Sequence, residues 1–263
     1  MTYCVAIKVH DGLVFAGDTR TTAGVDDVRS HPKLHCFELP GERVFVLLSA
    51  GNLATTQSVL NHAWRDWNGE GEGEGQGLRS VRHMYDAAEY IGQLLVRAQR
   101  DFSPSGQYNN VDFRATLILG GQIMGEDPAL YLVYPEGNCI ATSPETPYLQ
   151  IGESKYGKPI LDRMIKMTQT TLEDAARCAL VSLDSTMKSN LTVGPPLDLA
   201  ILRRDALAIR HRLRLDLDTP YYAALKKAWG EQLERVFREM LPKFEWEADP
   251  GQQPLPLSSP PAL

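Results

Sequence analysis

Residues 2–24 read TYCVAIKVHDGLVFAGDTRTTAG, and this stretch decides the fold. Residues 2–9 are small or β-branched with loose alternation, which is typical of a β-strand. Residues 10–12 then supply turn chemistry ahead of a second apolar run at 13–16. The stretch therefore predicts a hairpin whose first strand begins at the second residue of the chain.

The length of the hairpin loop decides which way Asp18 points. If residues 10–12 form a three-residue loop, Asp18 pairs opposite Cys4 and shares the face of Thr2. A two-residue loop turns Asp18 away from that face. The sequence is compatible with both loops, so the register stays open.

A threonine directly after Met1 has the makings of a nucleophile. Its hydroxyl is weak and needs a base to take its proton. Removal of Met1 frees the α-amino group of Thr2, whose pKa of about 7.7 to 8.0 makes it a usable base near neutral pH. The same residue also suits an ordinary strand. The hairpin, which returns Asp18 and Arg20 toward the terminus, favours the catalytic interpretation.

The rest of the chain alternates between strands and helices. Strands are expected at residues 43–49, 113–119, 130–134, 197–202 and 207–215. Helices are expected at 53–67, 80–100, 170–183 and 221–241, the third opened by a capping box of Thr170 and Glu173. This order suits two sheets stacked face to face and covered by helices on both outer sides.

The chain is expected to form one domain over residues 1–247. Within it, residues 68–77 read NGEGEGEGQG, which predicts a flexible surface loop. Residues 248–263 are rich in proline and are expected to form a disordered tail. The helix at 221–241 places Leu225, Trp229, Leu233 and Phe237 on one stripe, able to pack on a core or on a neighbouring subunit, with core packing favoured.

Composition argues against nucleic-acid and metal binding. The chain has 27 Lys and Arg against 33 Asp and Glu, a net charge of -6, and no basic stripe to neutralise a phosphate backbone. The histidines form no HExxH motif, and His31 and His35 straddle a proline, so a metal site is not expected. The four cysteines form no CxxC pair and are expected to be reduced, buried thiols, Cys4 among them.

The N-terminus lacks a basic region followed by a long apolar stretch, and no later segment is apolar enough to span a bilayer. We therefore expect a cytoplasmic protein without a membrane partner. No GxxxxGK[ST] phosphate loop is present, so the chain cannot itself power the unfolding of a substrate.

Residues 2–24 resemble the start of proteasome β subunits and of the bacterial heat-shock proteasome-like peptidase. Lys33 stands at a matching distance, SAGN at 49–52 opens the first helix, and IGES at 151–154 precedes another. The length, the segment SHPKLH and the C-terminal extension are most similar to the Anbu family of bacterial proteasome homologues. The resemblance covers residues 2–215 and implies an α+β fold, the four-layer αββα sandwich of N-terminal nucleophile hydrolases.

The resemblance assigns roles to the first site residues. It makes Thr2 the nucleophile and base, Lys33 the cation that lowers the pKa of the amine, and Asp18 the partner of Lys33. Without the resemblance, Asp18 and Lys33 suit an ordinary surface ion pair. Backbone N–H groups around Gly51 would form the oxyanion hole, which agrees with the unpaired N–H groups and positive dipole end of the helix that follows.

Supporting roles would fall to Ser154, Asp184 and Ser189. Where the family has a glycine-serine pair that supports the amine, this chain reads Gly152, Glu153, Ser154, so either Ser154 or Glu153 fills that role. The stretch STMKSNLTVGPP after Asp184 is longer than the family's serine-glycine turn, which leaves the role of Ser189 open.

These features together predict a threonine peptidase that cleaves unfolded peptides through an acyl-ester on Thr2. No cofactor is expected. The partners implied are a peptide or unfolded protein substrate, further copies of the chain in a ring or spiral, and a separate ATPase wherever substrates are folded. Two alternatives stay open: a small-amide hydrolase of the same fold, and a non-catalytic assembly subunit that kept the start motif.

Overall fold

The computed structural model describes residues 2–23, 27–70, 77–102 and 111–242. The chain divides into two compact units, Met1–Lys226 and Lys227–Leu263. Most of the predicted glycine-glutamate loop and the whole predicted tail lie outside the described residues, as does the predicted domain end at residue 247. The flexible loop and the disordered tail therefore stay predictions.

The predicted hairpin is confirmed and forms the middle of a five-stranded antiparallel sheet. The strand order in this first sheet is β10-β1-β2-β11-β12. The strands are β1 (Tyr3–Val9), β2 (Gly12–Asp18), β10 (Tyr148–Gly152), β11 (Leu197–Arg203) and β12 (His211–Leu215). Every residue of β2 is buried, because the sheet is covered on both faces.

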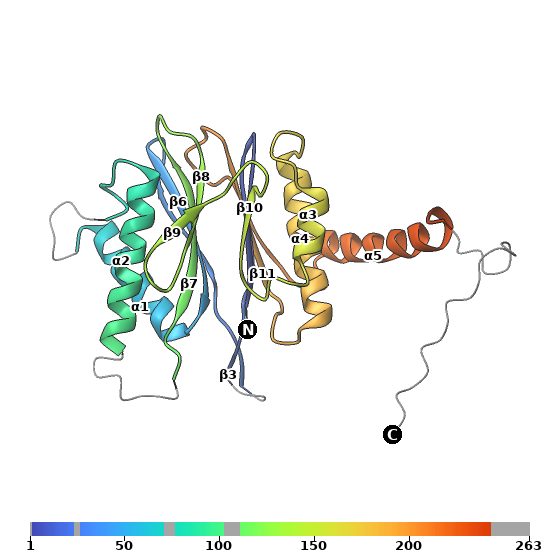
Figure 1. Cartoon of the computed structure of the whole chain (residues 1–263), viewed down its shortest axis with the longest axis horizontal. Helices are drawn as coiled ribbons and strands as arrows, with labels where there is room; N and C mark the ends of the chain where they lie inside the picture. Colours follow the sequence, from blue (N-terminus) through green and yellow to red (C-terminus); the bar gives the residue numbers. More distant parts are fainter. Residues whose placement is uncertain (1, 24–26, 71–76, 103–110, 243–263) are drawn as a thin grey trace, which may run out of the picture. The chain divides into compact units, whose positions relative to one another are not determined.

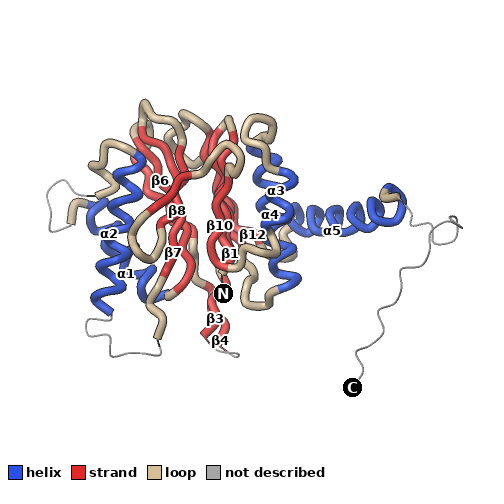
Figure 2. The backbone as a smooth tube through the Cα atoms, in the orientation of Figure 1, coloured by secondary structure: helices blue, strands red, loops and turns tan. Residues whose placement is uncertain are grey.

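A second five-stranded sheet has its strands in chain order. It consists of β5 (Leu34–Leu39), β6 (Arg43–Gly51), β7 (Ala115–Ile123), β8 (Ala129–Val133) and β9 (Cys139–Ala141). A separate two-stranded pair, β3 (Arg20–Ala23) with β4 (Asp27–Ser30), extends beyond the end of the two sheets (Figure 2).

Two pairs of helices cover the outer faces of the sheets (Figure 1). The second sheet is covered by α1 (Leu53–Asn68) and α2 (Met84–Phe102), and the first by α3 (Lys158–Met164) and α4 (Leu172–Ser189). Side chains such as Phe15, Leu48 and Ile118 fill the space between the two sheets. The predicted αββα sandwich is therefore confirmed.

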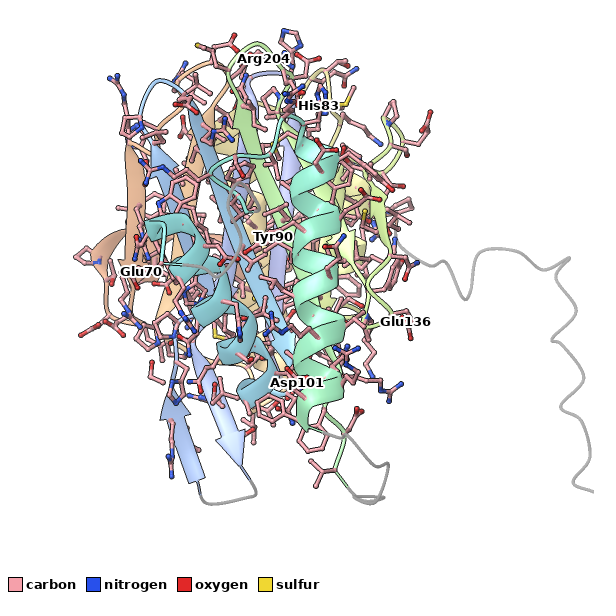
Figure 3. The ribbon with its side chains drawn as sticks, turned by 90° about the vertical axis from the view of Figure 1, so that its left-hand side faces the viewer. Glu70, His83, Tyr90, Asp101, Glu136 and Arg204 are labelled. Atoms are coloured by element: carbon pink, nitrogen blue, oxygen red, sulfur yellow. The ribbon has the colours of Figure 1, made fainter. Side chains whose placement is uncertain are left out.

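Hydrogen bonds fix the helices that cover the second sheet. The side chain of Asn52 accepts from the N–H of Thr55 and so begins α1, and Gly69 ends it in the left-handed conformation at φ 79°. Figure 3 looks onto this side of the molecule, where Tyr90 of α2 donates its hydroxyl to the carboxylate of Asp66 in α1. This hydrogen bond joins the two helices on the same face of the sheet.

The predicted capping box at Thr170 and Glu173 is wrong by one residue. The hydroxyl of Thr170 accepts from Lys166 in the preceding turn, at 2.8 Å. Thr171 caps α4 instead, because its hydroxyl accepts from the N–H of Asp174 at 3.1 Å. Both threonines could cap the helix, but the hydroxyl of Thr170 is already bonded to the preceding turn, so Thr171 is the cap.

The predicted strand at 207–215 is confirmed only from His211 onward. Asp205 and Leu207 adopt left-handed backbone conformations, with φ of 62° and 45°, which no strand accommodates. The chain is therefore turning where the alternation of apolar residues suggested a strand. The sequence analysis also missed α3 and the strands β3, β4, β5, β9 and β10.

The last predicted helix is present as α5 (Pro220–Arg235), followed by a π-helical turn, Val236–Met240. Leu225 of its apolar stripe packs against the buried cluster beneath α4, whereas Leu233 and Phe237 are exposed. In the part of the chain that the structure describes, no helix has both the length and the hydrophobicity to cross a bilayer.

Candidate active site

A two-residue turn joins β1 to β2, with Val9 opposite Gly12 and Cys4 opposite Gly17. This is the register that was expected to turn Asp18 away from the face of Thr2, and it leaves Asp18 beside Tyr3. Asp18 is the last residue of β2, so its carboxylate reaches round the end of the strand. There Oδ1 accepts a hydrogen bond from the N–H of Tyr3 at 3.0 Å.

Asp18 and Lys33 form a buried ion pair. Lys33 Nζ lies 2.7 Å from Asp18 Oδ1 and donates to the carbonyl of Arg20 at 2.6 Å. The N–H of Gly194 donates to Asp18 Oδ2 at 3.2 Å. Burial raises the pKa of Asp18, while the Lys33 charge and the two backbone N–H groups oppose that rise. The pair is not the ordinary surface contact that the residues alone allow.

Thr2 lies against the end of β10. Its carbonyl accepts from the N–H of Glu153 at 2.7 Å. The neighbouring Gly152 has a φ of +82°, and a Cβ there would lie 1.9 Å from the carbonyl oxygen of Thr2. Glycine is therefore required at this position, both by the backbone conformation and by the close approach of the chain.

A pocket of about 400 Å³ opens beside Thr2, and Lys33, His35, Gly51 and Gly152 are among its lining residues. A second hollow of about 300 Å³ shares Gly51 and Gly152 with the first and adds Arg114. The two hollows therefore meet at these two glycines, and Thr2 lines the first of them.

Gly51 ends β6 in a conformation that only glycine tolerates. Its φ is +108°, and a Cβ would lie 2.6 Å from the carbonyl of Arg114. The N–H of Ser49 donates to the carbonyl of Lys33 at 3.1 Å, and the N–H of Asn52 donates to Arg114 at 3.0 Å. Because successive N–H groups of a strand point to opposite edges, the N–H of Gly51 faces the edge where Lys33 lies.

The structure does not bring Ser154, Asp184 and Ser189 to this pocket. Asp184 is buried on α4, where Lys188 and Lys226 lie 3.5 and 3.8 Å from its carboxylate oxygens. Ser189 is the exposed last residue of α4. Ser154 is partly buried, and its carbonyl accepts from Lys158 at the start of α3.

The loop after α4 supplies contacts that sequence analysis missed. Asn190 Nδ2 donates to Glu153 Oε2 at 3.2 Å, and Gly194 contacts Asp18 as described above. Arg20 donates to the carbonyl of Leu191 at 2.6 Å. The only signal in the sequence was the unusual length of the stretch that follows Asp184.

Two residues next to Thr2 are buried in the core. The hydroxyl of Tyr3 lies 2.5 Å from both Ser182 Oγ and Gln150 Nε2, and burial raises its pKa. Cys4 is fully buried between the sheets, and burial raises the pKa of its thiol, which confirms it as a core residue. Among the described residues, His, Cys, Asp and Glu form no group of three that would hold a metal ion.

No protein-family model matches the chain, and a search of curated proteins gives no match. Solved structures match nearly all of it. Anbu (ancestral beta-subunit) from Yersinia bercovieri is 44% identical with a TM-score of 0.85, over 92% of this chain and 99% of that one. The helical assembly of the Anbu complex from Pseudomonas aeruginosa is 44% identical with a TM-score of 0.85, over 94% and 100%.

A third structure, an Anbu (Gly-1) mutant from Hyphomicrobium sp. strain MC1, is 42% identical with a TM-score of 0.84, over 93% of this chain and 100% of that one. Sequence identities above 40% across nearly complete chains indicate common descent and not only a shared fold. The chain described here belongs to the Anbu family of proteasome-like proteins.

Proposed function

We propose that the protein is a threonine peptidase of the proteasome type, with Thr2 as its nucleophile once Met1 has been removed. The observation that carries the proposal is the placement of Thr2, Lys33 and Gly51 around one pocket. The buried carboxylate of Asp18 holds Lys33 there at 2.7 Å. A cation fixed beside a hydroxyl and a glycine N–H is the arrangement that acyl transfer requires.

In the proposed reaction, the α-amino group of Thr2 takes the proton from the Thr2 hydroxyl as Oγ attacks the substrate carbonyl. The N–H of Gly51 stabilises the oxyanion, and the charge of Lys33 stabilises the unprotonated amine. The peptide C–N bond breaks, the leaving amine takes the proton, and an ester on Thr2 remains. The α-amino group of Thr2 then takes a proton from water, and the water hydrolyses the ester and regenerates Thr2.

The pocket beside Thr2 and the second hollow, which meet at Gly51 and Gly152, favour a polypeptide substrate over a small amide, since chain on either side of the scissile bond needs room. The substrate class we propose is therefore unfolded peptide, with a separate ATPase needed only for folded proteins. The structure from Pseudomonas aeruginosa is described as a helical assembly. We propose that this chain likewise forms a homo-oligomer, in a ring or a spiral.

The test is the intact mass of purified protein before and after treatment with a peptide epoxyketone, which reacts with a threonine hydroxyl and its free α-amine together. The expected result is loss of Met1 and one adduct per chain. Thr2→Ala should give no adduct and no turnover, whereas Thr22→Ala, which changes another pocket threonine, should keep the adduct.

Met1 retained in an active protein would refute the mechanism. A processed protein that forms no adduct and cleaves no peptide would be an assembly subunit. Cleavage of acylated amino acids without cleavage of peptides would identify a small-amide hydrolase.

A further inference from the structure

A second buried carboxylate, that of Glu153, lies beside Thr2 and has no part in the reaction described above. Tyr3 pairs with Gly152 between β1 and β10, so the next pair along the two chains is Thr2 with Glu153. The hydrogen bond from the N–H of Glu153 to the carbonyl of Thr2, at 2.7 Å, agrees with this pairing.

The Glu153 carboxylate is desolvated and oriented. The residue is 8% exposed, and burying a carboxylate costs free energy that partners must offset. Asn190 Nδ2 donates to Oε2 at 3.2 Å, and the largely exposed Lys155 lies 3.7 Å from Oε1. A carboxylate has about four acceptor positions, so these contacts leave capacity for a further donor.

Asn190 is itself fixed in orientation. Its Oδ1 accepts from the N–H of Thr192 at 3.0 Å and from the Thr192 hydroxyl at 2.6 Å, so its amide NH₂ is directed to Glu153. The same loop contacts Asp18 through the N–H of Gly194. One loop therefore orients two buried carboxylates near Thr2.

Resting on the proposed function, we propose that Glu153 is a positioning residue: its carboxylate, oriented by Asn190, holds the free α-amino group of Thr2 beside the Thr2 hydroxyl. Met1 removal exposes that amine one residue from the Tyr3 N–H, at the strand end where Glu153 is the opposing residue. An ammonium with three donors suits a carboxylate with unused acceptor positions. An amine held in this way is placed for proton transfer from its own hydroxyl.

The charges around the amine set the direction of the expected change. Lys33 favours the neutral amine, whereas Asp18 and Glu153 favour the ammonium. His31 and His35 line the same pocket as Thr2. Lys155 partly offsets Glu153 from the solvent side. Removing the negative charge of Glu153 should therefore lower the pKa of the Thr2 amine, by about one unit for a nearby opposite charge.

The experiment compares Glu153→Gln, which keeps the size of the side chain, with Glu145→Gln, which removes a carboxylate from an exposed position. The pKa of the Thr2 amine is measured from the pH dependence of its labelling by an amine-reactive anhydride, which requires no turnover. The acidic limb of kcat/KM for a peptide substrate is measured in parallel, and thermal unfolding verifies that each variant folds.

Glu153→Gln is expected to move the amine pKa and the acidic limb about one pH unit lower and to reduce kcat about tenfold. Asn190→Ala should shift both in the same direction by less, and Glu145→Gln should shift neither. An amine pKa and pH profile unchanged in Glu153→Gln would overturn this inference while leaving the peptidase proposal intact. If Glu153→Gln shifts the amine pKa but the wild-type protein cleaves no peptide, the inference is supported and the peptidase proposal is refuted. Retained Met1 would refute both.

Discussion

The Nζ atom of Lys33 lies 2.7 Å from Oδ1 of Asp18, and the two side chains are 8% and 0% exposed. A surface pair of this kind contributes under about 1 kcal/mol, but removing one partner of a buried pair leaves an uncompensated charge. The two residues therefore affect both the free energy of unfolding and the rate of peptide hydrolysis. Single variants and the pH dependence of stability distinguish these two effects.

Lys33→Ala is expected to lower kcat/KM by at least about 100-fold, because it removes the cation beside the developing oxyanion. The free energy of unfolding should fall by only about 1 to 3 kcal/mol, since the Asp18 carboxylate keeps the N–H donors of Tyr3 and Gly194. Peptide hydrolysis and urea unfolding measure the two effects, with the exposed Lys166→Ala as control. An unchanged rate, or a variant that does not fold, would make Lys33 a purely structural residue.

The stability of Lys33→Ala should depend on pH. Burial already raises the pKa of Asp18, and losing the Lys33 charge raises it further. The folded variant therefore holds its Asp18 proton to a higher pH than the unfolded chain, so its stability falls as pH rises from about 4 through the raised pKa. The destabilisation relative to wild type should be smaller at pH 4.5 than at pH 7, and Asp18→Asn with Lys33→Ala should remove that difference. A destabilisation independent of pH would contradict the prediction.

Gly152→Ala should be more damaging than the same change at Gly41. Both glycines are left-handed, with φ of +82° and +80°, so the backbone strain is matched. At Gly41 nothing lies within 4 Å of the added Cβ, whereas at Gly152 the carbonyl of Thr2 lies 1.9 Å away. Gly41→Ala should cost about 1 to 3 kcal/mol, and Gly152→Ala should cost more and slow epoxyketone labelling. If both variants lose the same free energy of unfolding and epoxyketone labelling is unaffected, the contact between residue 152 and the Thr2 carbonyl is not tight.

The hairpin and the two stacked sheets between helices were predictable from the pattern of residues, whereas the role of Lys33 was implied only by the family resemblance. Turn residues and alternation fix a hairpin, and buried apolar runs fix which strands lie in the middle. The direction of Asp18 was not predictable from strand alternation. Alternation assigns a side chain to a face, but a residue at a strand end can reach round it.

The supporting residues were harder to predict because they come from the ends of distant elements. Glu153 follows β10 and Asn190 follows α4, and only the packing of α4 on the first sheet brings them within 3.2 Å. Asp184 is equally buried but on a part of α4 where lysines surround it. Spacing along the chain does not distinguish these positions. The roles of Ser154, Asp184 and Ser189 stay predictions, and so does the part played by any neighbouring subunit.

Thiol alkylation should leave activity intact if Thr2 rather than Cys4 is the nucleophile. Cys4 is fully buried, and its raised pKa keeps the thiol protonated. Cys139 on β9 is partly exposed, and burial raises the pKa of the partly exposed Cys36 to about 11. Iodoacetamide at pH 8 should therefore label Cys139 first and Cys4 last, as read by peptide mass spectrometry. Inactivation that tracks alkylation of Cys4 would contradict the threonine mechanism.

The charge of the pocket predicts which peptides are cleaved fastest. Lys33, His31 and His35 line it, and none of the described lining residues is Asp or Glu. A substrate with Glu before the scissile bond should therefore have a higher kcat/KM than the matching Lys peptide. Burial lowers the pKa of His35, so its charge appears only at a pH below the ordinary histidine range, and the Glu-to-Lys ratio should rise as the assay is made more acidic.

The quantity compared is the ratio of kcat/KM for the Glu peptide to kcat/KM for the Lys peptide. Protonation of the Thr2 amine slows both peptides equally, so it does not change this ratio. His35→Gln should flatten its pH dependence, because glutamine stays neutral, while the exposed His10→Gln should not. A pocket that prefers Lys, or a ratio that is constant with pH in the wild type, would show that the side chain before the scissile bond lies elsewhere, for example in the hollow that Gly51 and Arg114 line.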